Sequence, residues 1–145
     1  MTRAARWVCW TIAVLSLAGV TVSSVSLYHH FQTSKTDYCD FGQAFNCDIV
    51  NRSVYSTIFG IPVALIGILG YAALGTLATF FRDRVDTPKA LLGASLAGLG
   101  FALYLTYIEG FVLGTWCILC LSSLTVILLI TILATFLMAQ SMRRA

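Results

Sequence analysis

The stretch Cys117–Gln140, CILCLSSLTVILLITILATFLMAQ, decides the fold class of this 145-residue chain. It contains no Lys, Arg, Asp or Glu, and about 20 mostly apolar residues in a helix are enough to cross a bilayer. Three further stretches have the same character. The spans that we predict cover residues 7–28, 57–81, 90–113 and 117–140. Because strand-like alternation is absent from these stretches, we expect an all-α membrane protein, a four-helix bundle with a long outer loop over residues 29–56.

The composition supports this prediction. Hydrophobic residues make up 59% of the chain and charged residues 10%, whereas a soluble domain has about 45–50% and about 25%. A chain of this length cannot bury so much apolar surface within itself. These values exclude a soluble enzyme, a disordered tail and a basic nucleic-acid binder, so we expect no nucleic-acid partner. We predict a single membrane domain over residues 1–145.

The basic residues predict the orientation, because Lys and Arg favour cytoplasmic loops. If the spans alternate in direction, seven basic residues lie on one side: Arg3, Arg6, Arg82, Arg84, Lys89, Arg143 and Arg144. Only Lys35 and Arg52 lie on the other side. We therefore expect both termini in the cytoplasm and residues 29–56 in the outer compartment.

The first span also has some features of a cleaved signal peptide. Two arginines precede its apolar run, and small residues follow at Thr21–Ser26. The apolar run is longer than the 7–15 residues that are usual in such peptides. We therefore expect this span to be retained as a membrane helix.

On this topology, four of the five cysteines lie at the outer face of the membrane and one lies near the cytoplasmic face. Cys39 and Cys47 lie in the outer loop, and Cys117 and Cys120 form a Cys-x-x-Cys motif where the chain re-enters the membrane. Cys9 lies a bilayer away and is most simply a buried apolar thiol. An even number of cysteines on one outer face is typical of disulfide chemistry.

The Cys-x-x-Cys motif begins a predicted helix, where unsatisfied backbone N–H groups favour a thiolate. A thiolate is the species that attacks a disulfide. Two other interpretations remain open for the motif: half of a zinc site, or a simple structural disulfide. The seven residues between Cys39 and Cys47 do not fit the usual zinc spacing of two to four, which favours a redox pair.

Two cysteine pairs on one face indicate a relay, because a disulfide moves by thiolate attack through a mixed disulfide. The loop pair can meet a soluble protein, while the other pair stays at the membrane. Electrons that reach the membrane pair then need a lipid-soluble acceptor. A quinone is the acceptor that we expect, bound near the first turns of the second and fourth spans.

The outer segments resemble the vitamin K epoxide reductase family, in particular its bacterial branch that forms disulfides with quinone. The residues that carry the resemblance are Cys39-Asp-Phe-Gly, Phe45-Asn-Cys47-Asp, Ser53, Phe59-Gly60-Ile-Pro62 and Trp116-Cys117-Ile-Leu-Cys120. The resemblance covers nearly the whole chain, and the combination of these motifs is more specific than any one of them. It implies a location in a bacterial plasma membrane.

The resemblance also implies roles for single cysteines. Cys117 and Cys120 match the membrane-embedded active-site pair, with Cys120 nearer the quinone. Cys39 and Cys47 match the loop shuttle pair, and Cys47 is expected to attack Cys117. The cofactor implied is a quinone of the menaquinone, ubiquinone or vitamin K type, with no metal.

Ser53 and Phe59 match a serine and an aromatic residue at the quinone head group. Vertebrate members of the family carry a tyrosine seven residues after the first active-site cysteine, where this chain has Leu124. Many bacterial members continue into a fused thioredoxin-like domain, whereas this sequence ends at Ala145. We therefore expect the thiol partner to be a separate thioredoxin-fold protein.

The function predicted is that of a membrane thiol–quinone oxidoreductase that generates disulfides in this partner. An alternative within the same class is an enzyme that reduces a quinone or vitamin K epoxide for quinone recycling. An alternative from another class is a thiol-based carrier of soft metal ions, since such ions prefer thiolates.

Several other residues are candidates for the quinone site. Glu109 is the only acidic residue within an apolar span, and it either relays protons to the quinone or turns toward the membrane surface. Tyr107 and Phe111 are spaced so that both could flank the quinone, although such aromatic residues are also typical of helix packing or the interface. We expect His29 and His30 to be solvated at the interface.

Overall fold

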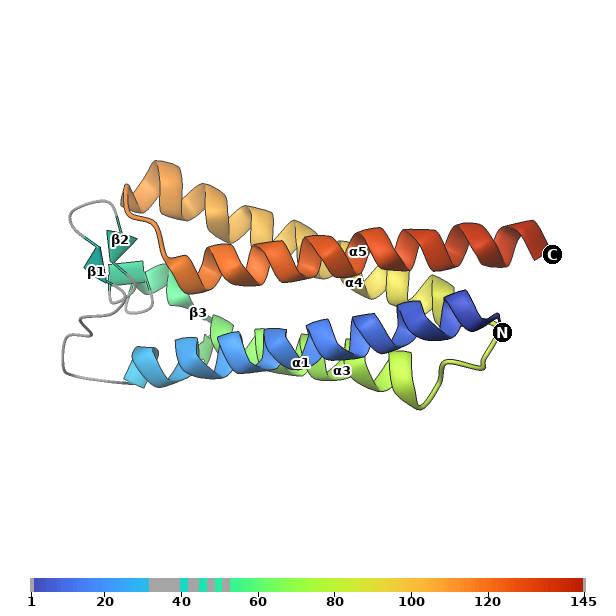
Figure 1. The fold of residues 1–145 in the computed structure, drawn as a ribbon. Helices are drawn as coiled ribbons and strands as arrows, with labels where there is room; N and C mark the ends of the chain where they lie inside the picture. Colours follow the sequence, from blue (N-terminus) through green and yellow to red (C-terminus); the bar gives the residue numbers. More distant parts are fainter. Residues whose placement is uncertain (1, 32–39, 42–44, 47–48, 51–52, 145) are drawn as a thin grey trace.

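The helices of the chain run alternately up and down along one long axis (Figure 1). The computed structural model describes residues 2–31, 40–41, 45–46, 49–50 and 53–144. Within these ranges the long helices are α1 (Arg3–Phe31), α3 (Val63–Thr79), α4 (Thr87–Tyr107) and α5 (Ile118–Arg144). A π-helical segment, η3 (Ile108–Leu113), continues α4 without a break.

Three helices in the described part of the chain are long and apolar enough to cross a membrane: α1, α5, and α4 together with η3. The remaining helix, α3, is also apolar but has 17 residues, at the lower limit of the usual range. The count of four spans therefore stays a prediction.

Short strands lie at the end of the bundle opposite the termini (Figure 1). They form two antiparallel pairs, β1 (Asp40–Phe41) with β2 (Phe45–Asn46), and β3 (Thr57–Ile58) with β4 (Ile61–Pro62). A short 3₁₀ turn, η2 (Val54–Ser56), precedes β3.

The hairpin of β3 and β4 replaces the predicted start of the second span. Phe59 and Gly60 connect the two strands and both have positive φ, 52° and 80°. A tight type I′ turn requires positive φ at two successive residues. The prediction that a helix begins at Thr57 is therefore wrong, because this turn delays the start of α3 to Val63.

Small residues let α1 and α3 approach closely along their length. Three contacts repeat in antiparallel order: Gly67 against Ser23, Tyr71 against Gly19, and Gly75 against Ser16. A Cβ atom added to Gly19 would lie 2.4 Å from Cδ1 of Tyr71, so this position has no room for a side chain. Close backbone approach of this kind is a main source of helix association in lipid. Lipid tails are as apolar as the helix surfaces, so burying one helix against another gains little hydrophobic free energy.

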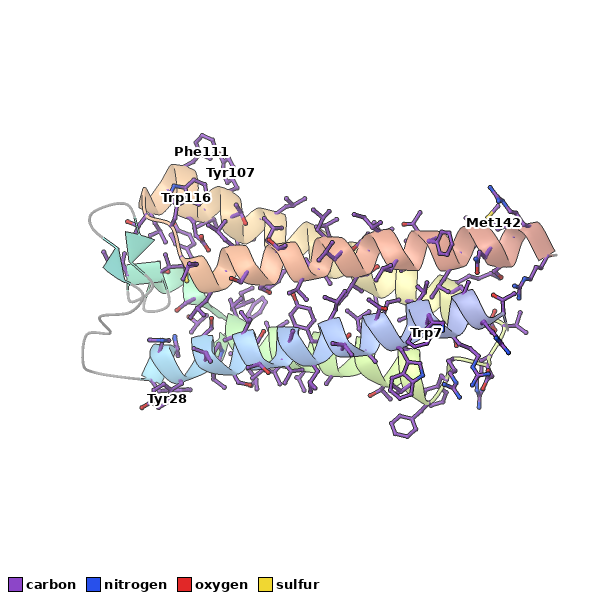
Figure 2. All side chains as sticks on the ribbon, in the orientation of Figure 1. Trp7, Tyr28, Tyr107, Phe111, Trp116 and Met142 are labelled. Atoms are coloured by element: carbon purple, nitrogen blue, oxygen red, sulfur yellow. The ribbon has the colours of Figure 1, made fainter. Side chains whose placement is uncertain are left out.

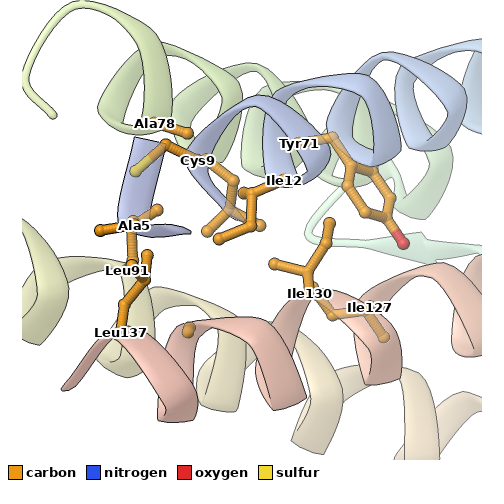
Figure 3. Packing of buried hydrophobic residues seen from close by; sticks show 11 residues of the cluster. Ala5, Cys9, Ile12, Tyr71, Ala78, Leu91, Ile127, Ile130 and Leu137 are labelled. Carbon is orange, nitrogen blue, oxygen red and sulfur yellow. The ribbon is translucent and has the colours of Figure 1, made fainter. Parts of the chain in front are cut away.

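An apolar core packs between the helices (Figure 3). Ile12, Leu91 and Ile130 are fully buried in it. Cys9 belongs to the same core and is 1% exposed. The prediction that Cys9 is a buried apolar thiol is confirmed.

Both chain ends and the connection between α3 and α4 lie at the same end of the bundle (Figure 1). These segments and the first turn of α4 contain the seven basic residues that the sequence predicts on one side. The strands and the turn between η3 and α5 lie at the opposite end (Figure 1). The candidate site is at that second end.

Candidate functional site

The Cys-x-x-Cys motif lies at the reversal between η3 and α5. Gly114 ends η3 in the left-handed conformation, with φ 65°. Cys117 then caps α5, since its carbonyl accepts the N–H of Leu121 at 3.0 Å. At a helix start the first backbone N–H groups have no partner within the helix, and the helix dipole favours negative charge there.

The two cysteines of the motif have different surroundings. Cys117 is fully buried and packs with Val50 and Leu113, so a segment of the outer loop covers it. Cys120 is partly exposed and lines an internal cavity that Cys117 does not reach. The two cysteines are not joined by a disulfide. One pair of thiols thus has one member under the loop and the other at the cavity.

The cavity has a volume of about 480 Å³, within the range of about 300–1,000 Å³ for small-molecule sites. All the long helices contribute to its lining, which is mainly apolar. The polar groups in the lining include Ser53, Glu109 and Cys120 from the predicted set. An apolar space with few polar groups suits a lipid-soluble molecule with a polar head.

Glu109 is buried beside the motif and is 1% exposed. Its Oε2 atom accepts the N–H of Cys117 at 3.2 Å, and Glu109 and Cys120 both line the cavity. The alternative prediction, that Glu109 turns toward the membrane surface, is therefore wrong. The inward orientation is stabilised because the unpaired backbone N–H of a helix start attracts a carboxylate.

Ser53 also lines the cavity, but its hydroxyl already has an acceptor. Its Oγ donates to the carbonyl of Val50 at 2.9 Å. A quinone oxygen only accepts hydrogen bonds, so Ser53 reaches one only if its hydroxyl rotates away from Val50.

His30 and Ser56 contact each other at the cavity. Ser56 Oγ lies 3.3 Å from Nδ1 of His30, and both residues line the cavity. His29 is fully buried. The prediction that both histidines are solvated is therefore wrong, because His29 is buried and Ser56 of η2 lies against His30.

The structure does not bring the three predicted aromatic residues to the cavity. Tyr107 and Phe111 are 58% and 80% exposed and stack on each other with ring centroids 5.0 Å apart. They point away from the other helices (Figure 2). Phe59 is fully exposed at the turn of the β3–β4 hairpin. Their helix and turn positions direct them outward, where aromatic rings suit lipid or the interface.

The predicted shuttle cysteines, Cys39 and Cys47, lie outside the described residues. In sequence they flank the antiparallel pair that joins Asp40 to Asn46. The described residues contain no group of three or more His, Cys, Asp or Glu side chains that could hold a metal ion.

The geometry thus combines a dithiol at a helix start with an apolar cavity. A family model described as the vitamin K epoxide reductase family matches residues 10–135. The chain belongs to this family. The matched range includes the motif, Glu109 and Ser53 but not Cys9.

Membership in the vitamin K epoxide reductase family establishes the general activity. The chain is an integral membrane oxidoreductase that acts on thiols with a quinone as acceptor. The cavity beside Cys120 fits such an acceptor, because its lining is mainly apolar and carries few polar groups. Those polar groups are able to orient a quinone head.

Sequence reasoning missed two residues of this site. Val50 covers Cys117, and Tyr71 lines the cavity with its hydroxyl 2.8 Å from both Oγ and the carbonyl oxygen of Ser123. A tyrosine in the middle of an apolar span is a signal that could have identified Tyr71, because its hydroxyl needs a partner in lipid. No comparable signal marks Val50.

Proposed function

We propose that this protein is a thiol–quinone oxidoreductase that generates disulfides in a separate thioredoxin-fold protein. Electrons pass from the partner's thiols to Cys39/Cys47, then to Cys117/Cys120, and then to a quinone. The proposal rests on family membership together with the difference between the two motif cysteines.

That difference is the observation that carries the proposal. Cys117 is covered by Val50 of the outer loop segment, and Cys120 lines the cavity. A sulfur on the loop side suits exchange with another disulfide, which proceeds by thiolate attack. A sulfur on the cavity side suits transfer to a lipid-soluble acceptor. The step balances because the two thiols lose two electrons and two protons, an S–S bond forms, and the quinone becomes a quinol.

The loop pair is the proposed entry point for electrons. Pairing of β1 with β2 supports this role, since it joins the residues next to Cys39 and Cys47 in sequence. The Val50 contact supports an approach of the same loop to Cys117. Cys47 is the proposed attacking residue, as in the family pattern.

The proposed setting is a bacterial plasma membrane, in which α3 also spans the bilayer and residues 1–145 form one membrane domain. The seven basic residues at the end with both termini support a cytoplasmic location for that end. The motif then faces the outer compartment, where disulfides persist. The quinone is of the menaquinone, ubiquinone or vitamin K type.

The test uses the full chain in lipid nanodiscs with a small dithiol and a quinone. Wild-type protein should convert the quinone to quinol, and Cys117→Ser or Cys120→Ser should reduce the rate to the uncatalysed level. Cys9→Ser is the matched control, since this buried thiol lies at the other end of the bundle, and it should retain the wild-type rate. Full activity in both motif variants would refute the proposal.

A second experiment addresses the relay and the partner. Cys39→Ala and Cys47→Ala should preserve quinone reduction by the small dithiol but block oxidation of a reduced thioredoxin-fold protein. In cells, Cys47→Ala should accumulate a mixed disulfide between Cys39 and the thioredoxin-fold partner, detectable by non-reducing electrophoresis and mass spectrometry. Equal loss of both activities would exclude a shuttle role for the loop pair.

A further inference from the structure

Glu109 organises the turn that carries the active-site motif. Its backbone carbonyl accepts the N–H groups of Gly114 and Thr115, the latter at 3.1 Å. Its Oε2 atom accepts the N–H of Cys117 at 3.2 Å. Glu109 also lies in the π-helical segment η3, and π-helical turns in helices are frequently found at functional sites.

The second carboxyl oxygen has no such partner. Oε1 of Glu109 is buried and makes no hydrogen bond within the described part of the chain. An unsatisfied buried carboxyl oxygen is costly and requires an explanation. Glu109 lines the cavity together with Cys120. The unsatisfied oxygen therefore belongs to a residue that borders the proposed quinone site.

We propose that Glu109 accepts the proton of the Cys120 thiol and delivers it to a quinone oxygen. The inference rests on the proposed quinone reduction and assigns a residue to its proton transfer. One carboxyl oxygen then holds the motif in place through Cys117, while the other exchanges a proton with the reacting groups.

The proton balance of the step is complete. The Cys120 S–H bond breaks, its proton goes to Oε1, and the Cys120 thiolate remains. Formation of the Cys117–Cys120 S–S bond releases two electrons to the quinone. The Glu109 O–H bond then breaks and its proton passes to a quinone oxygen, which restores the carboxylate. The Cys117 thiol loses the second proton as the S–S bond forms, and the restored Glu109 carboxylate, which contacts Cys117 and lines the cavity, passes this proton to the other quinone oxygen.

A purely structural role for Glu109 is the competing explanation, and Glu109→Gln separates the two. The amide oxygen of glutamine can still accept the N–H of Cys117, but the side chain cannot accept a thiol proton. Glu109→Asp keeps an ionisable group on a shorter side chain. Glu109→Ala removes both functions.

The experiment measures quinone reduction by a small dithiol in nanodiscs as a function of pH. General acid–base catalysis contributes about 100-fold or more, so Glu109→Gln should lower the rate by about that factor near neutral pH. The loss should shrink as pH rises, because hydroxide then deprotonates the Cys120 thiol. Glu109→Asp should be slower than wild type but keep the wild-type pH profile. The other titratable side chains that face this region are Cys117, His30, Tyr55 and Tyr71.

Each outcome separates the possibilities. A Glu109→Gln rate equal to that of wild type, or a loss that is the same at every pH, would overturn the proton role. If wild type itself fails to reduce quinone, the proposed function fails first. If the glutamine variant does not fold, as judged by circular dichroism, the aspartate variant decides. An altered pH profile in Glu109→Asp, or a rate there that matches Glu109→Ala, would then overturn the inference.

Discussion

Substitution of Gly19 by alanine tests the packing of α1 against α3 most directly. The added Cβ would lie 2.4–2.5 Å from three atoms of the Tyr71 ring, whereas carbon atoms in contact are about 3.5–4.0 Å apart. The ring must therefore shift by about 1 Å. It has little room to do so, because Tyr71 is 5% exposed and its hydroxyl lies 2.8 Å from two oxygens of Ser123.

The magnitude follows from two contributions. Overpacking of a filled core costs about 1–3 kcal/mol, and loss of the Tyr71 hydrogen bonding costs about 1 kcal/mol more. We expect Gly19→Ala to lower the free energy of unfolding by about 2–4 kcal/mol. That corresponds to a change of about 30- to 700-fold in the unfolding equilibrium.

The assay is SDS-induced unfolding in mixed micelles, followed by far-ultraviolet circular dichroism. Gly93→Ala on α4 is the matched control, because a Cβ there would meet nothing within 4 Å. Combining Gly19→Ala with Tyr71→Ala should remove most of the cost of the first change, which a double-mutant cycle measures. Equal stability of Gly19→Ala and Gly93→Ala would refute this account of the packing of α1 against α3.

Two further predictions concern activity. Gly110→Ala would place a Cβ 2.8 Å from the Trp116 ring, so it should disturb the turn before the motif and reduce quinone reduction by about 10-fold, or about 1.4 kcal/mol. Gly100→Ala, where a Cβ meets nothing within 4 Å, should keep the wild-type rate; equal rates in both variants would contradict the role of this contact. Ala97→Phe fills part of the cavity and should raise the KM for quinone about 10-fold, whereas Leu96→Phe outside the lining should not. An unchanged KM in Ala97→Phe would argue that quinone binds elsewhere.

The sequence predicts the positions of the helices well because apolar length is a strong signal. It fails at Phe59 and Gly60, since this segment is apolar enough to extend the following span, and only the backbone conformation reveals the turn. The motif at the start of α5 could be predicted from the sequence. Its spacing is local, and the adjacent apolar run indicates where the helix begins.

The side chains around the motif are less predictable. Tyr107 and Phe111 are as apolar as residues that face the cavity, and a membrane helix that is hydrophobic on all sides carries no pattern to separate its two faces. The orientation of Glu109 depends on its hydrogen bond to Cys117 across the turn. Contacts of this kind produce no periodic pattern in a single sequence, so they cannot be predicted from it.

The contact between Glu109 and Cys117 has a consequence for biogenesis. It joins residues eight positions apart, and closing so short a loop carries a small entropic cost. The hairpin of α4 and α5 can therefore form this turn as it enters the bilayer, before it meets α1 and α3. The cavity is lined by all four long helices, so the turn that carries the dithiol can form first, whereas the acceptor site exists only once all four helices have packed together.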